Sequence, residues 1–187
     1  MTHEKLCFVI SPIGDADSET RKRSEQVLNY VVRPAVTSCG YKAVRADEID
    51  KPGMITSQVI QHVVNDDLVV ADLTERNPNV FYELAIRHAL RKPLVQIIRK
   101  GEAIPFDVAG TRTIYVDHKD LDSVAAAKNE IIKQVKALGH RDANFRVARS
   151  PTSAAEARGT FAGKRRSYSR QNRRHLLVRE QVLQPSV

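Results

Sequence analysis

The stretch Leu68–Val95 (LVVADLTERNPNVFYELAIRHALRKPLV) holds the residues of this chain whose types and spacing point most clearly to chemistry. An apolar strand ends in an acid, Asp72, and after a short polar loop a helix begins that carries one carboxylate, Glu83, near its start. In parallel sheets, side chains at the carboxyl end of a strand and at the start of the next helix converge on one crevice. A carboxylate there can act as a nucleophile or stabilise a developing positive charge. We therefore expect Glu83 and Asp72 to belong to one site.

The loops around this predicted crevice supply candidate ligand-binding residues. One loop is the turn after an apolar strand that ends at Ile10, where backbone N–H groups can hold a phosphate or a hydroxyl group. A second loop leads into the helix that carries Glu83, and a third follows the strand that ends at Arg45. The predicted ligand-binding residues are Ser11, Pro12, Ile13, Gly14, Asp47, Asn77, Asn79 and Tyr82. Tyr82 fits a core position as well as a wall that stacks on a base.

Structural roles compete with functional ones at several of these positions. Glu83 and Arg87 are four residues apart on the predicted helix, which is the spacing of a surface ion pair. Asn77 and Asn79 suit a helix start, where asparagine caps free N–H groups. Asp72 can cap the loop that follows it. The histidines show no ligand spacing, so we predict no metal site and no cofactor.

Apolar runs alternate with amphipathic helical segments along the first 140 residues. The predicted strands are Leu6–Ile10, Tyr41–Arg45, Leu68–Ala71, Leu94–Ile98 and Thr113–Val116, and the predicted helices are Ser18–Cys39, Met54–Asn65, Asn77–Arg91 and Asp120–Leu138. Pro34 should kink or break the first helix near Val32, and Gly139 should end the last one. This alternation predicts a flavodoxin-like α/β fold, a five-stranded parallel sheet in the order 2-1-3-4-5 with helices on both faces.

Short segments at these positions resemble two related bacterial families. CFVISPIG, VVADLT, NPNVFYELAIRHALRKP and IPFD are similar to sequences of the nucleoside 2-deoxyribosyltransferase family and of the Toll/interleukin receptor (TIR) domain. The resemblance covers roughly residues 5–118. It matches Glu83 with the glutamate that both families use as catalytic carboxylate, on the helix after the third strand, and it matches Asp72 with the acidic end of that strand. The resemblance therefore implies that Glu83 and Asp72 are catalytic. Asn77 stands where the transferases usually have an aspartate.

This resemblance implies an enzyme that cleaves the N-glycosidic bond of a nucleotide or nucleoside, with Glu83 as nucleophile or as stabiliser of the oxocarbenium ion. The activity is expected to be that of a NAD glycohydrolase or of a deoxyribosyltransferase-like enzyme, and the candidate substrates are NAD, a nucleoside monophosphate and a modified nucleotide. An asparagine at position 77 matters less for NAD, because nicotinamide leaves with little help from an acid. The alternative is a non-catalytic nucleotide-sensing or self-assembly signalling module, because TIR-like folds often act by self-association. A homo-oligomer and a role in bacterial defence signalling are also implied.

The positive charge of the chain is concentrated at its carboxyl end. Residues 141–187 hold 11 Lys and Arg against 3 Asp and Glu, so the whole formal net charge of +8 belongs to this segment. We predict a nucleoside 2-deoxyribosyltransferase-like/TIR-like domain over residues 1–140 and a basic, disordered tail over 141–187 that contacts nucleic acid or acidic surfaces. No secretory signal or transmembrane segment is recognised, and the two cysteines form no disulfide framework, which favours a cytoplasmic location.

Overall fold

The computed structural model describes residues 4–49 and 54–147, with side chains described as far as Gly139. The chain divides after Gly139 into two units, and the first unit holds the whole described sheet. Most of the predicted basic tail, residues 148–187, lies outside the described residues. The site and its supports are therefore described for the first unit alone.

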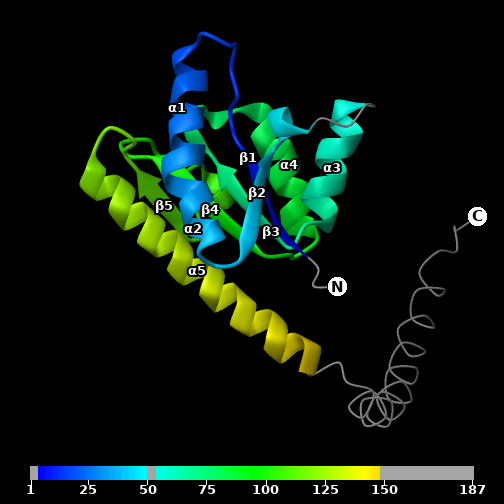
Figure 1. The fold of residues 1–187 in the computed structure, drawn as a ribbon. Helices are drawn as coiled ribbons and strands as arrows, with labels where there is room; N and C mark the ends of the chain where they lie inside the picture. Colours follow the sequence, from blue (N-terminus) through cyan, green and yellow to red (C-terminus); the bar gives the residue numbers. More distant parts are fainter. Residues whose placement is uncertain (1–3, 50–53, 148–187) are drawn as a thin grey trace, which may run out of the picture. The chain divides into compact units, whose positions relative to one another are not determined.

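Five parallel strands form one sheet in the order β2-β1-β3-β4-β5 (Figure 1). The strands are β1 (Lys5–Ile10), β2 (Tyr41–Arg45), β3 (Leu68–Asp72), β4 (Leu94–Arg99) and β5 (Thr113–Val116). In the centre of the sheet Val9 is in register with Val70, and Val70 with Val95. The predicted flavodoxin-like fold and its strand order are confirmed.

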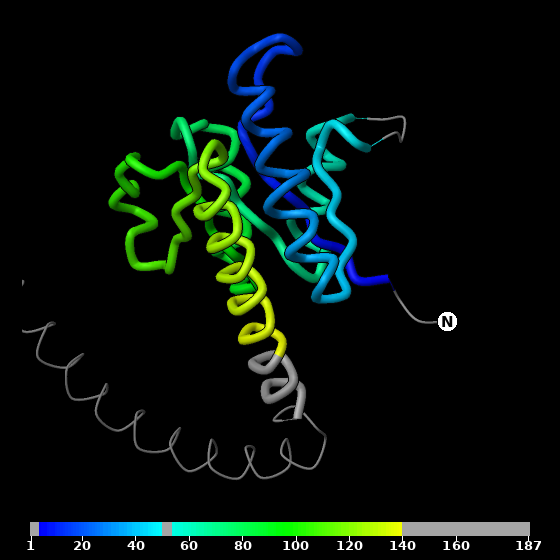
Figure 2. The backbone as a smooth tube through the Cα atoms, turned by 60° about the vertical axis from the view of Figure 1, so that its left-hand side comes forward, coloured from blue at the N-terminus to red at the C-terminus, as the bar shows by residue number. Residues whose placement is uncertain are grey.

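Helices cover both faces of the sheet and create two separate apolar cores. The helical segments are α1 (Glu19–Val27), η1 (Leu28–Val32), α2 (Arg33–Thr37), α3 (Ile55–Asn65), α4 (Pro78–Ala89) and α5 (Leu121–Val147), with short 3₁₀ turns η2 (Ala46–Glu48), η3 (Thr74–Arg76) and η4 (Phe106–Val108). The segments α1, η1, α2 and α5 pack on the face that contains Cys7, Val9 and Val70. The helices α3 and α4 pack on the face that contains Phe8 and Ala71. Figures 1 and 2 show α1 and α5 on one side of the sheet and α3 and α4 on the other.

The long first helix is interrupted where the sequence places a proline. Between α1 and α2 the backbone forms a π-helix, η1, which ends at Val32, and Pro34 lies in the first turn of α2. Proline lacks an N–H group and its ring crowds the preceding turn, so an ordinary α-helix cannot pass through it unchanged. The predicted break near Val32 is confirmed.

The last helix is longer than predicted. Helix α5 runs to Val147 and passes through Gly139, which we expected to end it. Gly139 does not adopt the positive φ of a glycine that terminates a helix, such as Gly40, where φ is 81°. A glycine inside a helix costs only about 1 kcal/mol, and the residues around Gly139 are good helix formers.

Across the described ranges, no helix has both the length and the apolar character that a membrane span requires.

Arg87 links α4 to the segments at the amino-terminal end of the sheet. Its side chain is fully buried, and its guanidinium donates hydrogen bonds of 2.8 to 3.3 Å to the backbone carbonyl oxygens of Val63, Asp66, Asp67 and Pro93. These carbonyl groups belong to the end of α3 and to the loops before β3 and β4. The alternative role considered for Glu83, a surface ion pair with Arg87, does not fit the structure, because the Arg87 side chain is buried.

We expect Arg87→Met to destabilise the fold by about 3 kcal/mol or more, because it removes the buried guanidinium that donates hydrogen bonds to four backbone carbonyl oxygens. Urea unfolding followed by circular dichroism measures this loss. Arg112→Met is the matched control, since the Arg112 side chain is mostly exposed. Equal stability of the two variants would contradict the role given to Arg87.

Candidate functional site

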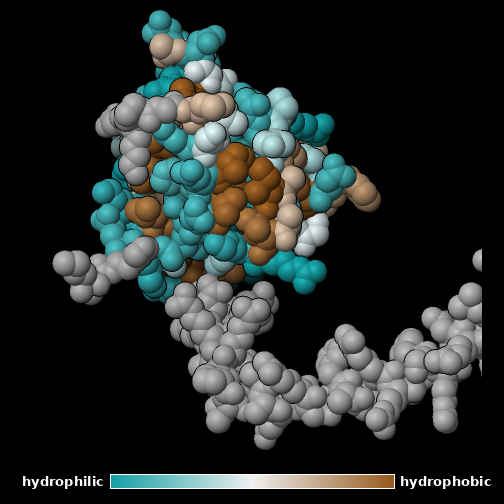
Figure 3. All heavy atoms as spheres, turned by 90° about the vertical axis from the view of Figure 1, so that its right-hand side faces the viewer, coloured by the Kyte–Doolittle hydropathy of each residue, from teal (hydrophilic) through white to brown (hydrophobic). Residues whose placement is uncertain are grey.

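A cavity of about 390 Å³ opens between the carboxyl end of β1 and the helices α3 and α4. Its lining combines an apolar floor and wall with a few polar groups. The lining residues are Phe8, Val9, Ile10, Ser11, Ile13, Gly14, Ala46, Ile55, Thr56, Val59, Ile60, Asn77, Asn79, Val80, Tyr82 and Glu83. Figure 3 views the molecule from the side that carries α3 and shows apolar side chains gathered on this face. The cavity lies at the predicted end of the sheet.

Glu83 is the only acidic residue among those described that line the cavity. Within the described part of the chain, no hydrogen bond or ion pair reaches its carboxyl group. Burial away from water disfavours the charged form and raises the Glu83 pKa to about 7. The start of α4 therefore does not keep this carboxyl group as acidic as an exposed glutamate. It is half ionised near neutral pH, which suits a group that must switch between charged and neutral states.

The start of α4 brings three predicted residues to the cavity besides Glu83. Asn77 is the N-cap, and its side-chain oxygen accepts a hydrogen bond of 3.0 Å from the backbone N–H of Asn79. Pro78 follows in the first turn, where its missing N–H costs nothing. Asn77, Asn79 and Tyr82 all line the cavity, and Tyr82 is exposed, so it is not a core residue. Helix capping and cavity lining are compatible here.

The loop between β1 and α1 forms another side of the cavity. Ser11, Ile13 and Gly14 line it, whereas Pro12 is buried and does not. Gly14 has a φ of 67°, and a Cβ atom built on it would lie 2.5 Å from the Oγ atom of Ser18, the N-cap of α1. The loop therefore needs glycine at this position to reach the helix without strain.

Asp72 lies away from the cavity, on the opposite face of the sheet. Its Oδ2 atom is 2.9 Å from Nη1 of Arg23, and its Oδ1 atom accepts hydrogen bonds from the backbone N–H and the hydroxyl group of Thr74. Alternation along β3 explains the placement, because Ala71 packs with α3 and α4 and the next side chain must point toward α1. The expectation that Asp72 shares one crevice with Glu83 is wrong.

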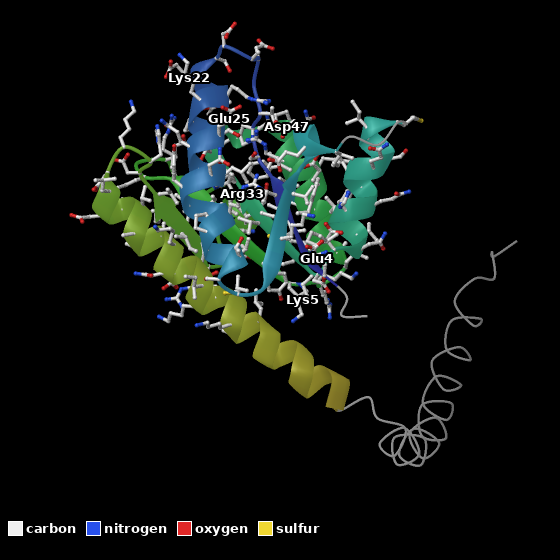
Figure 4. The ribbon with its side chains drawn as sticks, viewed as in Figure 1. Glu4, Lys5, Lys22, Glu25, Arg33 and Asp47 are labelled. Carbon is white, nitrogen blue, oxygen red and sulfur yellow. The ribbon has the colours of Figure 1, made fainter. Side chains whose placement is uncertain are left out.

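Asp47 is also absent from the cavity lining. It accepts hydrogen bonds of 2.6 and 2.7 Å from Arg45, and its Oδ2 atom is 2.8 Å from Nη2 of Arg21. Burial opposes its ionisation, but the hydrogen bonds and charges of the two arginines outweigh burial and lower the Asp47 pKa. Figure 4 shows Asp47 beyond the end of β2, beside α1. The predicted direct contact between Asp47 and a ligand is therefore not supported by its position.

Helix α3 contributes a wall that sequence reasoning did not assign to the site. Ile55, Thr56, Val59 and Ile60 line the cavity. The helical spacing of the apolar residues was visible in the sequence, but it predicts burial against a core and a cavity wall equally well.

Among the described residues, no cluster of three or more His, Cys, Asp or Glu is arranged to hold a metal ion.

Comparisons with known proteins give likenesses of fold. No family model and no curated protein sequence matches the chain. A 2-deoxyribosyltransferase from Bacillus psychrosaccharolyticus shares 16% identity, with a TM-score of 0.47 over 63% of this chain and 90% of that chain. A CMP N-glycosidase from Clostridium botulinum shares 16% identity, with a TM-score of 0.41 over 62% of this chain and 93% of that one. A 2-deoxyribosyltransferase from Leishmania mexicana also shares 16%, with a TM-score of 0.41 over 64% and 76%. The flavodoxin-like assignment itself rests on the strand order.

Replacing Glu83 by glutamine should make the folded state less sensitive to pH. Because the folded-state pKa of Glu83 is raised from 4.5 to about 7, the wild type loses stability as pH rises through this range, whereas the variant has no such term. We expect the stability of Glu83→Gln relative to wild type to increase by about 1–2 kcal/mol between pH 4.5 and pH 8, a figure reduced for partial solvent screening. Urea unfolding at both pH values measures it, and a difference that stays constant would contradict the raised pKa.

Proposed function

We propose that this protein cleaves the N-glycosidic bond of a nucleoside or nucleotide, with Glu83 as nucleophile or as stabiliser of the oxocarbenium ion. The observation that carries the proposal is the half-buried carboxyl group of Glu83 in a cavity at the carboxyl end of the sheet, where it has no hydrogen-bond or ionic partner among the described residues. The motif around Glu83 supports the proposal, because its Tyr-Glu-Leu and Ala-Leu-Arg-Lys-Pro elements resemble those of the 2-deoxyribosyltransferases.

The chemistry requires one ionised carboxylate beneath the anomeric carbon of the sugar. As the bond between C1′ and the base nitrogen breaks, its electron pair leaves with the base and positive charge develops at C1′. A carboxylate oxygen of Glu83 either faces this charge or forms a bond to C1′. Water or a second base then attacks C1′ and, in the covalent route, releases the carboxylate. The apolar part of the lining strengthens the attraction between the carboxylate and the developing charge.

The substrate range of the proposal follows from the cavity and its polar groups. A volume of about 390 Å³ is within the range of small-ligand sites and suits one nucleoside unit. No acidic side chain other than Glu83 is among the described lining residues, so a base that leaves without strong protonation is favoured. Nicotinamide in NAD is such a base, because its ring nitrogen is already positively charged in the substrate. Asn77 then contributes hydrogen bonding rather than a proton.

A nucleotide-sensing or self-assembly module is the second candidate. Apolar side chains of Met54, Ile55 and Tyr82 are exposed, and the last two also line the cavity. Such a rim can be covered when copies of the chain associate, or it can close on a ligand that is bound without turnover. Binding of a nucleotide with no release of base in any state of association would favour this candidate over the enzyme.

We expect Glu83→Gln to reduce base release from the best substrate by at least about 10²–10³-fold, while the affinity for that substrate changes little. Incubation with NAD, deoxynucleosides and nucleoside monophosphates, followed by chromatography of the free base, measures release. Glu130→Gln is the control, since Glu130 forms ion pairs with Arg112 and Lys133 and does not line the cavity. Full activity of Glu83→Gln would exclude Glu83 from the reaction.

The pH dependence of base release distinguishes a carboxylate from a carboxylic acid. With the Glu83 pKa at about 7, the ionised fraction grows with pH and levels off about one unit higher. We expect kcat/KM, which reports the free enzyme, to rise through this range and then reach a plateau. A value that falls above pH 7 would instead assign a proton-donating role to Glu83.

A further inference from the structure

Ser11 lies in the loop between β1 and α1 and carries a hydroxyl group. It lines the same cavity as Glu83 but belongs to a different wall. A serine hydroxyl group can donate one hydrogen bond and can also accept, so its position alone does not say what it offers a ligand. The groups behind Ser11 settle this question.

Two buried side chains lie behind Ser11 in the direction of α1 and β2. Ser24 and Arg45 are each 2% exposed. The Nη1 atom of Arg45 is 2.6 Å from the Oγ atom of Ser24, and that Oγ atom is 3.4 Å from the Oγ atom of Ser11. A guanidinium group has only donors, so Ser24 must accept the hydrogen bond from Arg45.

The hydroxyl group of Ser24 can still donate one hydrogen bond. Among the described residues, the Oγ atom of Ser11 is the remaining hydrogen-bond partner of Ser24. A buried hydroxyl group is costly to leave without an acceptor, so Ser24 donates to Ser11. The hydrogen of Ser11 is left free, and no acceptor for it occurs within the described part of the chain. It is available to a molecule in the cavity.

Asp47 fixes the far end of this chain of groups. It accepts two hydrogen bonds from Arg45, from Nε and Nη2, and leaves Nη1 for Ser24. The lowered pKa of Asp47 keeps its carboxylate ionised at neutral pH, with Arg21 as a second cationic partner. All three nitrogen atoms of the Arg45 guanidinium therefore donate hydrogen bonds, and its orientation toward Ser24 is fixed.

We propose that Ser11 is a specificity-determining hydrogen-bond donor in this cavity, with Ser24 and Arg45 as positioning residues that set the direction of its hydroxyl group. Its partner is a neutral acceptor oxygen of the ligand, either a sugar hydroxyl oxygen or the carbonyl oxygen of a base. The nucleoside identity of this ligand rests on the proposed function. Ionised Glu83 only accepts hydrogen bonds, so the cavity presents a donor on one wall and an acceptor on another.

The test measures binding without turnover. The Glu83→Gln protein is titrated calorimetrically with inosine, with its 2′-deoxy, 3′-deoxy and 5′-deoxy analogues, and with nebularine, which lacks the base carbonyl oxygen. Adding Ser11→Ala should weaken the binding of inosine about three- to tenfold. It should leave the affinity for one analogue unchanged, namely the analogue that lacks the acceptor oxygen. That analogue identifies the source of the oxygen as sugar or base.

The positioning role is tested by a double-mutant cycle. Ser24→Ala should weaken inosine less than Ser11→Ala does, and it should have no further effect once Ser11 is alanine. Ser38→Ala is the matched control, because the Ser38 hydroxyl group donates to the carbonyl oxygen of Ala35 and lies outside the cavity lining. Ser24→Cys, which keeps the volume with a weaker donor, replaces Ser24→Ala if that variant does not fold.

Three results would overturn the proposal. They are an equal loss for all five ligands in Ser11→Ala, independent effects of the two serines, and no binding by any of the ligands. Base release by the wild type is measured separately, with NAD, deoxynucleosides and nucleoside monophosphates. Binding that depends on Ser11 without any base release would exclude the proposed function and support Ser11 as donor. Base release that is unchanged by Ser11→Ala would support the proposed function and exclude Ser11 as donor.

Discussion

Coverage of the sheet on both faces is the constraint on which the rest of this structure depends. Each strand residue must point to one helical layer or to the other, and successive residues alternate between them. On β3 this rule sends Ala71 toward α3 and α4 and sends Asp72 toward α1 and Arg23. Two acidic residues that are close in the sequence therefore serve different layers, and only Glu83, which reaches the cavity from a helix, remains in contact with it.

The two layers then take on different tasks. The layer of α1 holds charged networks, in which the buried Asp72 pairs with Arg23 and the partly exposed Asp47 pairs with Arg45. The layer of α3 and α4 contributes apolar side chains to the cavity and leaves Glu83 without a charged partner among the described residues. Burial opposes the ionisation of both Asp47 and Glu83. The arginines around Asp47 outweigh burial and lower its pKa, whereas burial alone raises the pKa of Glu83. The raised pKa of Glu83 is thus a product of the separation between the layers.

Much of this architecture could be predicted from the sequence, because apolar runs, helical spacing, Pro34 and the Asn77-Pro78 start signal are local. Local signals also placed Ser11, Asn77, Asn79 and Glu83 at one end of the sheet, where they line the cavity. The errors concern direction and partners. Applying alternation to β3 would have turned Asp72 away, but nothing local shows that Arg45 binds Asp47 or that Arg87 reaches the carbonyl groups of other segments.

Helix α4 carries its anchor and its reactive group one turn apart. The guanidinium of Arg87 is held by carbonyl oxygens of three neighbouring segments, so the helix can neither roll about its axis nor slide along the sheet without breaking several hydrogen bonds. Glu83 lies one turn earlier on the same side of the helix. The direction of the Glu83 carboxyl group therefore depends on hydrogen bonds at the opposite end of the sheet. Side chains of α3 can be exchanged to reshape the cavity while this direction stays constant.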